Sequence, residues 1–210
     1  MYSQNNEEEI ILNYFNGHIG TVLDIGANDG KTFSNSRKLT ELGWKGIMVE
    51  PSILAFLRLS NLYKGNDNVS LHNIAITEKD GNVILHESGP LCSKKLKKKD
   101  IALISTIKEE ELYRWRKWEG RIFWTRVLVV GRTFESFYNS LDEEFKEIDF
   151  ITIDAEGMDY EILSQIDLEK LKTKLVCVEY IKNSDKFLSY LLEHGYRHIA
   201  TTKENVICGI

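Results

Sequence analysis

Acidic side chains recur at the ends of the short apolar runs of this sequence. Asp24 lies at the end of the first run, Glu50 ends the second, and Asp154 and Glu179 end two later runs. Such runs predict buried strands, and ligands of open α/β sheets bind beyond the carboxyl ends of the strands. We therefore expect these carboxylates to form the rim of one site.

The loop after the first run, within "VLDIGANDGKTFSNS", is rich in glycine but matches no phosphate-binding motif. Its Gly-Lys-Thr imitates the end of a P-loop, yet Gly26 lies four residues before Gly30 rather than five, and Asp29 would repel phosphates. Asn28 occupies the place of the second glycine of a dinucleotide fingerprint, where its side chain would crowd a pyrophosphate. The loop therefore favours a neutral or cationic nucleoside.

S-adenosylmethionine (SAM) is such a nucleoside, because it carries a sulfonium, an ammonium group and a ribose diol but no phosphate. Gly26 and Gly30 would let the backbone turn tightly and approach the ligand. Asp24 can lie near the ammonium group, and Glu50 can accept both ribose hydroxyl hydrogens. Alternatively, Asp24 and Asp29 are turn or helix-cap residues and Glu50 is a solvated strand end. The position of Glu50 one strand after the loop favours the role of a ribose-binding residue over that of a solvated strand end.

Helices alternate with strands over most of the chain, which implies a parallel sheet covered on both faces. The last two strands are separated by about four residues, too few for a crossover, so this pair is antiparallel. We predict an α/β, Rossmann-like, doubly wound and mostly parallel sheet with a C-terminal antiparallel strand pair. The predicted strands are 21–25, 46–50, 69–76, 82–86 (in a hairpin after Asp80-Gly81), 126–130, 148–154, 175–180, 196–201 and 205–210.

The helices are expected at 7–15, 31–42, 52–63, 107–118, 134–141, 158–166 and 185–194. No linker or repeat divides the chain, so residues 1–210 form one predicted domain. It begins with an N-terminal helix within residues 1–18. Residues 88–125 are less regular and are interpreted as an insertion that covers an acceptor site.

Several stretches together resemble the FkbM-type SAM-dependent methyltransferases: "VLDIGANDGKTFSNSRKL", "GWKGIMVEPS", "LHNIAITEKDG", "STI", "VLVVGRTFESF", "IDFITIDAEGMDYEIL" and "LVCVEY". The resemblance covers residues 22–180 and implies the class I SAM methyltransferase fold. It also implies O-methylation of a small molecule or a sugar. The Lys-rich loop and "RWRKWEGRIFW" depart from the family pattern at the segments that would shape the acceptor pocket.

The cofactor is expected to be SAM. The resemblance implies contacts at Asp24, Gly26, Asn28 and Glu50 and around Ala75. With the neighbouring loop and strand-end positions, the predicted cofactor-binding residues are Asp24, Gly26, Ala27, Asn28, Asp29, Gly30, Glu50, Pro51, Asn73, Ala75, Ile76 and Asp154.

Asp154 and Glu156 are the candidate catalytic residues, because a hydroxyl acceptor must lose a proton during methyl transfer. Asp154 could instead cap the helix near Met158 or contact the cofactor. A divalent metal held by Asp154, Glu156 and Glu179 is a weaker alternative, and no metal is assigned.

Ser105, Thr106, Trp118 and Glu179 are the predicted substrate-side residues. The resemblance places Ser105 and Thr106 over the active site, while their spacing to Glu109 also suits a capping box. The tryptophans among arginines in 114–124 suit base stacking, core packing or a cover over the acceptor. The segment "KKLKKKD" is interpreted either as a solvated loop or as a loop that attracts an anionic acceptor.

The composition is that of a soluble globular protein, with 42% hydrophobic residues, 28% charged residues and a net charge of -5. This charge gives no general attraction to nucleic acid or an anionic membrane. The polar, acidic first residues lead us to expect no secretory signal, and no apolar run reaches about 18 residues, so no membrane partner is expected. Cys92, Cys177 and Cys208 form no metal-binding or disulfide pattern, which suggests a reducing cytoplasm.

Two functional alternatives remain beside the O-methyltransferase. The first is methylation of a nucleic acid, and the second is a nucleoside-binding protein without catalysis, since no histidine follows the key strands. The sequence does not identify the acceptor or the oligomeric state.

Overall fold

The computed structural model describes residues 1–89, 103–119 and 123–210, with the backbone alone at residues 118 and 119. Its strands are β1 (Thr21–Ile25), β2 (Lys45–Val49), β3 (Val69–His72), β4 (Ala75–Ile76), β5 (Gly81–Ser88), β6 (Trp124–Arg132), β7 (Phe150–Ile153), β8 (Leu175–Glu179), β9 (Arg197–Thr201) and β10 (Asn205–Gly209). Its helices are α1 (Glu7–Phe15), α2 (Arg37–Glu41), α3 (Ile53–Leu62), α4 (Glu109–Glu119), α5 (Phe134–Asn139), the short 3-10 helix η1 (Glu143–Phe145), α6 (Asp159–Leu163), α7 (Leu168–Leu171) and α8 (Ser184–Glu193).

The main sheet of the described residues has the strand order β3-β2-β1-β7-β8-β10-β9. All neighbours from β3 to β8 are parallel, whereas β10 runs antiparallel to both β8 and β9. This confirms the predicted doubly wound sheet with its C-terminal antiparallel pair. The chain winds from β1 out to β3 and later returns to β7 on the other side of β1, so the topological switch point lies between β1 and β7.

Alternate side chains of the main strands pack into two separate cores, one on each face. Leu23 and Ile25 of β1 join the cluster with Phe137 of α5 and Ile162 of α6. Val22 points to the opposite face, where Ile11 of α1, Leu39 of α2 and Leu59 of α3 pack. Burial on both faces explains why these strands read as continuous apolar runs.

A second, smaller sheet has the order β4-β6-β5 and corrects two predictions. The predicted strand 69–76 is divided at Asn73, and its last residues form β4, which pairs in parallel with β6. The expected hairpin after Asp80-Gly81 is wrong as well, because β5 pairs antiparallel with β6 along its whole length. Asn73 Nδ2 donates to the backbone oxygens of Glu50 and Pro51, which ends β3 and turns the chain out of the main sheet.

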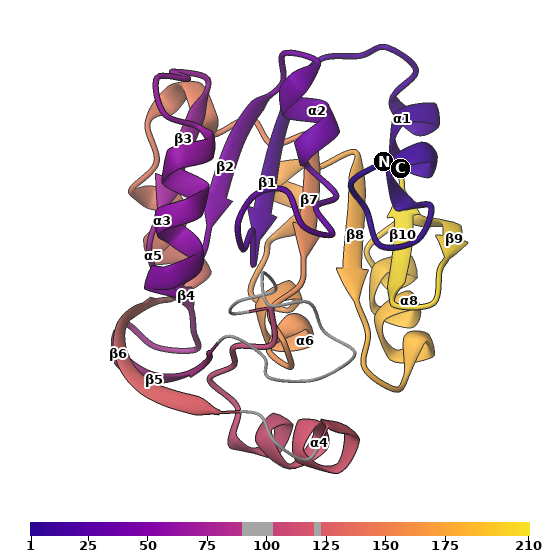
Figure 1. Cartoon of the computed structure of the whole chain (residues 1–210). Helices are drawn as coiled ribbons and strands as arrows, with labels where there is room; N and C mark the ends of the chain where they lie inside the picture. The colour runs from indigo at the N-terminus through magenta and orange to yellow at the C-terminus, as the bar shows by residue number, and fades with distance from the viewer. Residues whose placement is uncertain (90–102, 120–122) are drawn as a thin grey trace.

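The small sheet and α4 lie beyond the carboxyl ends of the main parallel strands. The arrowheads of β1, β7 and β8 point toward them in Figure 1. These elements belong to or adjoin the region predicted as a cover, although residues 90–102 and 120–122 of that region lie outside the described residues. The Lys-rich loop and Cys92 are among these, and the other two cysteines are buried free thiols.

The helix predicted over residues 31–42 is shorter than expected and begins at Arg37. Lys31 and Thr32 instead lie in a turn, because Asp29 accepts hydrogen bonds from both of their backbone N–H groups, at 2.9 and 2.7 Å. A short side chain that satisfies the local backbone competes with the helix, so the helix cannot start there.

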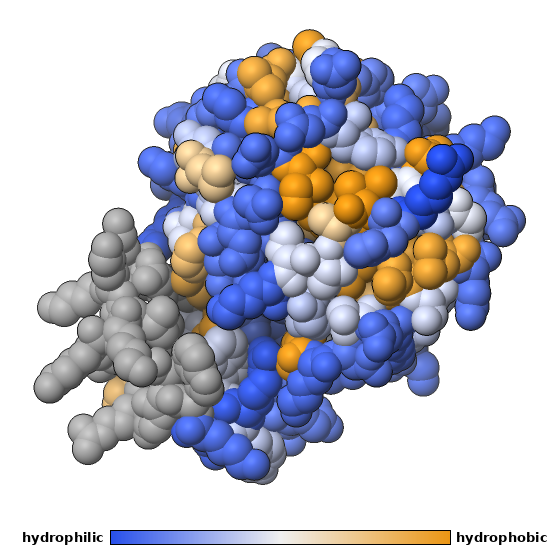
Figure 2. Space-filling view, turned by 90° about the vertical axis from the view of Figure 1, so that its right-hand side faces the viewer, coloured by the Kyte–Doolittle hydropathy of each residue, from blue (hydrophilic) through white to orange (hydrophobic). Residues whose placement is uncertain are grey.

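The helices of the described residues are all short or polar. In the parts that the structure covers, none of them is long and apolar enough to cross a bilayer. Figure 2 shows apolar side chains gathered on the face that carries α1, α8 and β9, where Leu192 of α8 and Ile199 of β9 are exposed.

Candidate functional site

A cavity of about 560 Å³ opens at the switch point of the main sheet. Its wall is made by the loops that follow the parallel strands and by the segment before α4. The predicted site residues that line it are Asp24, Gly26, Ala27, Asn28, Glu50, Pro51, Ala75, Ile76, Ser105, Thr106, Asp154, Glu156 and Glu179. The fold thus brings together residues that are up to 155 positions apart in the chain, from Asp24 to Glu179.

Gly26 lets the loops after β1 and β7 touch. A Cβ at this position would lie 1.7 Å from the carbonyl oxygen of Asp154, and the φ angle of Gly26 is 92°. The backbone N–H groups of Gly26 and Ala27 both donate to the carbonyl of Val49, which fixes the loop to β2. Gly26 therefore positions the backbone at the bottom of the cavity.

Glu50 is a buried carboxylate with both oxygens in use. Oε2 accepts the backbone N–H of Asn28 at 2.8 Å, and Oε1 accepts the backbone N–H of Ser52 at 2.7 Å. Only 5% of the residue is exposed, so it is no solvated strand end. Burial, reinforced by the charges of Asp24 and Asp154, raises the pKa of Glu50 to about 8.

Asp24 is also buried, and it lies next to the start of α2. The hydroxyl of Ser36 donates a hydrogen bond to Asp24 Oδ2. Burial raises the pKa of Asp24 to about 6, although this hydrogen bond opposes the shift. Asp24 and Glu50 therefore place two desolvated carboxyl groups on one side of the cavity.

Three of the predicted cofactor residues lie beside the cavity rather than on its wall. Asp29 holds the turn before α2, as described above, and this fits the alternative turn interpretation. Gly30 faces α3, where a Cβ would lie 2.6 Å from Leu59 Cδ1. Asn73 holds the Glu50-Pro51 backbone through its side-chain amide.

The loop after β7 is a tight turn organised by Asp159. The two oxygens of Asp159 accept the backbone N–H groups of Ala155 and Gly157, at 2.6 and 3.0 Å. Within this turn Glu156 adopts a φ angle of 47°, in the left-handed region. Asp159, the first residue of α6, therefore holds the turn that precedes the helix, while no side chain of the described residues caps α6 at Met158. The side chain of Asp154 is exposed to the cavity.

The carboxyl groups around this loop raise one another's pKa values. Removal from bulk water, together with the charge of Asp159, raises the pKa of Asp154 to about 7. Burial and the charge of Asp154 also hold the pKa values of Glu156 and Glu179 well above their usual range. Such shifts are typical of acid–base sites and of sites that bind a cation.

The segment containing Ser105 and Thr106 is attached to both the small sheet and the loop after β7. Thr106 pairs with His86 of β5 through two backbone hydrogen bonds. Its hydroxyl donates to the carbonyl of Glu156 at 2.7 Å and accepts the backbone N–H of Lys108 at 3.0 Å. The hydroxyl of Ser105 accepts the backbone N–H of Ser88.

Helix α4 adds a cation and an aromatic ring to the cavity wall. Arg114 Nη2 lies 3.2 Å from Glu156 Oε2, and the guanidinium also pairs with Glu111. The guanidinium carbon lies 4.9 Å from the centre of the Trp115 ring. The predicted Trp118 also belongs to α4, but its side chain lies outside the described residues.

A family model described as the methyltransferase FkbM domain matches residues 24–198. The chain belongs to the FkbM methyltransferase family. The matched range runs from Asp24 to the second residue of β9 and includes the loops after β1, β2 and β7. No curated protein matches the chain.

Solved structures resemble this FkbM domain only distantly. They include monomeric WbdD, at 11% identity over 99% of this chain and 41% of that one with a TM-score of 0.48. The N-terminal domain of human METTL16 in complex with SAH aligns at 12% identity over 96% and 66%, with a TM-score of 0.44. The fibrillarin of a fibrillarin/Nop5p complex aligns at 15% identity over 90% and 70%, with a TM-score of 0.42. This FkbM chain thus spans about two fifths of the WbdD chain.

Two segments outside the matched FkbM domain complete the cavity wall. Gln4, before α1, and Lys203 and Glu204, in the turn between β9 and β10, all line the cavity. Neither segment carries a recognisable motif, so sequence analysis did not find them. Asp159 was also missed, although its spacing five residues after Asp154 is a signal for an acid that holds the turn, and Arg114 was considered only as one of the arginines of 114–124.

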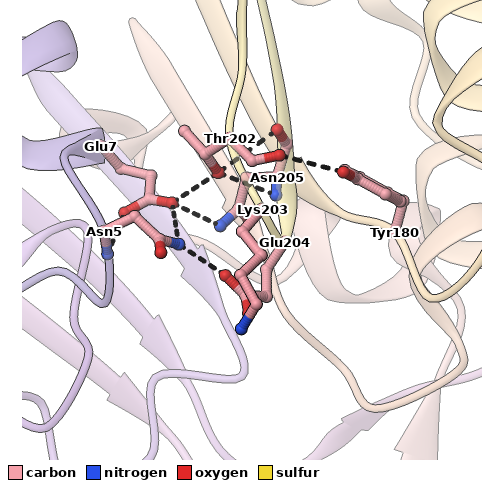
Figure 3. Close-up of polar contacts among 7 residues, drawn as sticks. All are labelled: Asn5, Glu7, Tyr180, Thr202, Lys203, Glu204 and Asn205. Carbon is pink, nitrogen blue, oxygen red and sulfur yellow. Dashed lines mark hydrogen bonds and ion pairs between the residues drawn. The ribbon is translucent and has the colours of Figure 1, made fainter.

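A buried carboxylate, Glu7, joins these two segments. Glu7 Oε1 accepts hydrogen bonds from the Thr202 hydroxyl at 2.6 Å and from Asn205 Nδ2 at 3.1 Å, and Asn5 Nδ2 donates to both Glu7 and Glu204. Figure 3 shows this network, with the Tyr180 hydroxyl donating to the Thr202 carbonyl from the β8 side. Its hydrogen bonds outweigh burial and lower the pKa of Glu7.

Proposed function

We propose that this protein is a SAM-dependent methyltransferase that methylates a hydroxyl group of a small molecule or a sugar. The observation that carries the proposal is the meeting of Glu50, Asp24 and the Gly26 turn with Asp154 in one cavity at the switch point of the sheet. Family membership supports methyl transfer, and the carboxyl groups favour a cofactor with positive charge over one with phosphates.

The residues of the cavity fit this cofactor. Each Glu50 oxygen has a second lone pair beyond its backbone hydrogen bond, so Glu50 can still accept from two ribose hydroxyls. Asp24 offers a negative charge for an ammonium group in a desolvated place, where attraction between charges is strongest. Ala75 and Ile76 also line the cavity, and their apolar side chains suit an adenine ring.

When bound, SAM would supply an activated methyl group, so the protein mainly has to position the acceptor. Asp154 is the proposed proton acceptor for the attacking hydroxyl, because it faces the cavity and its pKa of about 7 is close to the working pH. Glu156 is held beside Asp154 by its ion pair with Arg114. The two residues remain the candidate catalytic pair.

The region 88–125 is proposed as the cover of the acceptor site within a single domain, residues 1–210. In its described part, Ser105, Thr106 and Trp115 line the cavity, and Glu179 lies opposite on β8. The acidic wall suits a polyhydroxylated acceptor, since carboxylates accept hydrogen bonds from hydroxyls. It suits a nucleic acid less well, because its phosphates would meet the same carboxylates.

Ligand-induced stabilisation tests the cofactor assignment. Saturating SAM or S-adenosylhomocysteine, at about 100 times its dissociation constant, should add about 2.7 kcal/mol to the free energy of unfolding, whereas NAD and ATP should add little. Glu50→Ala should remove most of this effect. Stabilisation by NAD without stabilisation by SAM would overturn the proposed cofactor.

Turnover tests catalysis separately from binding. We expect release of S-adenosylhomocysteine when the protein and SAM are incubated with a library of sugars and small alcohols. Asp154→Asn should lower this rate while cofactor-induced stabilisation persists. A different result is that the protein binds the cofactor, fails to methylate any hydroxyl compound and yet methylates a labelled RNA oligonucleotide. That result would replace the O-methyltransferase by the nucleic-acid alternative.

A further inference from the structure

Three carboxyl groups from three different elements converge on one wall of the cavity. Asp154 follows β7, Asp159 opens α6 and Glu179 ends β8, and one oxygen of each lies within 4.8 Å of the others. The backbone N–H groups of Ala155 and Gly157 fix the carboxylate of Asp159. One member of the group, Asp159, is therefore held in place by the fold.

One of these carboxylates, Glu179, has an oxygen without a donor in the described part of the chain. Among the described residues, Glu179 Oε2 is buried and has no hydrogen-bond partner. A buried carboxylate oxygen without a partner is costly, so such atoms in native proteins are paired or bind a metal.

The nearby positive charge does not balance the cluster. Arg114 faces this region, but its guanidinium is already paired with Glu111 and Glu156. The three carboxylates of the cluster therefore lack a matching cation among the ion pairs of the described residues.

We propose that Asp154, Asp159 and Glu179 bind one divalent cation of the Mg²⁺ or Mn²⁺ type through oxygen ligands. Carboxylates are the ligands that these hard cations prefer, and both keep several waters, for which the open cavity has room. The site does not require the proposed methyl transfer. Its use does rest on that function: the cation would hold an acceptor oxygen, and Asp154 would then be a ligand rather than a proton acceptor.

Direct metal binding tests the proposal without an acceptor. The protein is treated with EDTA, desalted and titrated with MnCl₂, while the electron paramagnetic resonance signal of free Mn²⁺ reports binding. We expect one saturable Mn²⁺ per chain and displacement by Mg²⁺. Glu179→Gln should weaken binding at least about tenfold, and Glu193→Gln, at an exposed carboxylate of α8, should leave it unchanged.

The fold of each variant is checked by its thermal unfolding, and Asp154→Asn serves as a second cluster variant if Glu179→Gln does not fold. Absence of saturable Mn²⁺ binding, or equal binding by Glu179→Gln and Glu193→Gln, would overturn the metal site. S-adenosylhomocysteine binding is measured in parallel in EDTA. Cofactor binding without Mn²⁺ binding rejects the metal site alone, whereas Mn²⁺ binding without cofactor binding rejects the proposed methyltransferase alone.

Discussion

The backbone N–H of Asn28 donates a 2.8 Å hydrogen bond to Glu50 Oε2, which joins the loop after β1 to the end of β2. Asn28 has a φ angle of 47°, so this contact holds a left-handed residue in place. Because Glu50 also accepts from Ser52, a single carboxyl group organises two loops at once. Its protonation state should therefore affect both ligand binding and stability.

Cofactor affinity should increase with pH around neutrality. The pKa of Glu50 is about 8 in the free protein, and ribose hydroxyls donate to its ionised form, so binding must release a proton below that pH. We expect the affinity for S-adenosylhomocysteine to rise up to about tenfold per pH unit from pH 6.5 to 8, measured by isothermal titration calorimetry. Glu50→Gln should lose this part of the pH dependence, and Glu78→Gln should keep it. Parallel pH profiles for all three proteins would contradict the role of Glu50.

Stability should change with pH in the opposite direction. The pKa of Glu50 is raised from 4.5 to about 8, so the folded protein holds a proton that the unfolded chain releases. The stabilisation is complete below about pH 4.5 and is lost as pH rises to about 8. Urea unfolding of the ligand-free protein between pH 5 and 8 should show a free energy of unfolding that falls more steeply than in Glu50→Gln. The difference between the two slopes isolates Glu50 from the other titrating groups.

Gly26→Ala should destabilise the protein strongly. The new Cβ would overlap the Asp154 carbonyl, in addition to the cost of a positive φ angle. Gly43→Ala is the matched control, because Gly43 has a φ angle of 95° and a Cβ added there would meet no atom within 4 Å. We expect Gly26→Ala to lower the free energy of unfolding by about 1–3 kcal/mol more than Gly43→Ala does. Equal losses would mean that the two loops can separate at little cost.

Thr106→Val should weaken the attachment of the loop after β7. The substitution removes the hydroxyl that donates to the Glu156 carbonyl while nearly conserving volume at a residue that is only 1% exposed. A loss of about 1–3 kcal/mol in the free energy of unfolding is expected, and Thr106→Ser should restore most of it. Chemical denaturation of the three proteins measures this. If serine were no better than valine, the methyl group rather than the hydroxyl would be the important part.

Glu7→Gln should destabilise the part of the cavity wall that lies outside the matched FkbM domain. Glu7 is fully buried and accepts from Asn5, Thr202 and Asn205, and a glutamine offers only one of the two acceptor oxygens. We expect a loss of about 1–3 kcal/mol by urea unfolding. Glu9→Gln, an exposed acid in the same first turn of α1, controls for the helix dipole and should have little effect. A similar loss in both variants would assign the effect to the helix rather than to the network.

Much of the fold was predictable because buried parallel strands leave an unambiguous apolar pattern, as in "FITI" and "LVCV". The same pattern hid the break at Asn73, since apolar residues such as Leu71 and Ile74 occur on both sides of it and the side-chain contacts of Asn73 show where β3 ends. The helix at 31–42 was overextended because Asp29 acts through a contact with the backbone that periodicity does not register.

The sequence predicted the site residues that lie at the ends of parallel strands, but not those that reach the cavity from other elements. Strand ends located Glu50 and Asp154, because the carboxyl ends of parallel strands must share an edge. Gln4 and Lys203 reach the same cavity through the packing of α1 and of the C-terminal hairpin. No local spacing relates these positions, so only the folded chain shows their proximity.

The contact of Asn5 and Glu7 with residues 202–205 also joins segments that lie 195 to 199 positions apart in the sequence. During synthesis Asn5 and Glu7 emerge well before their partners Thr202, Glu204 and Asn205. Contacts over such a sequence separation carry a loop-closure cost in entropy that slows their formation. The cavity wall at Gln4 therefore closes only after residues 202–205 have been made, and a chain shortened before residue 202 would leave the buried Glu7 with hydrogen bonds from Asn5 but none from Thr202 and Asn205.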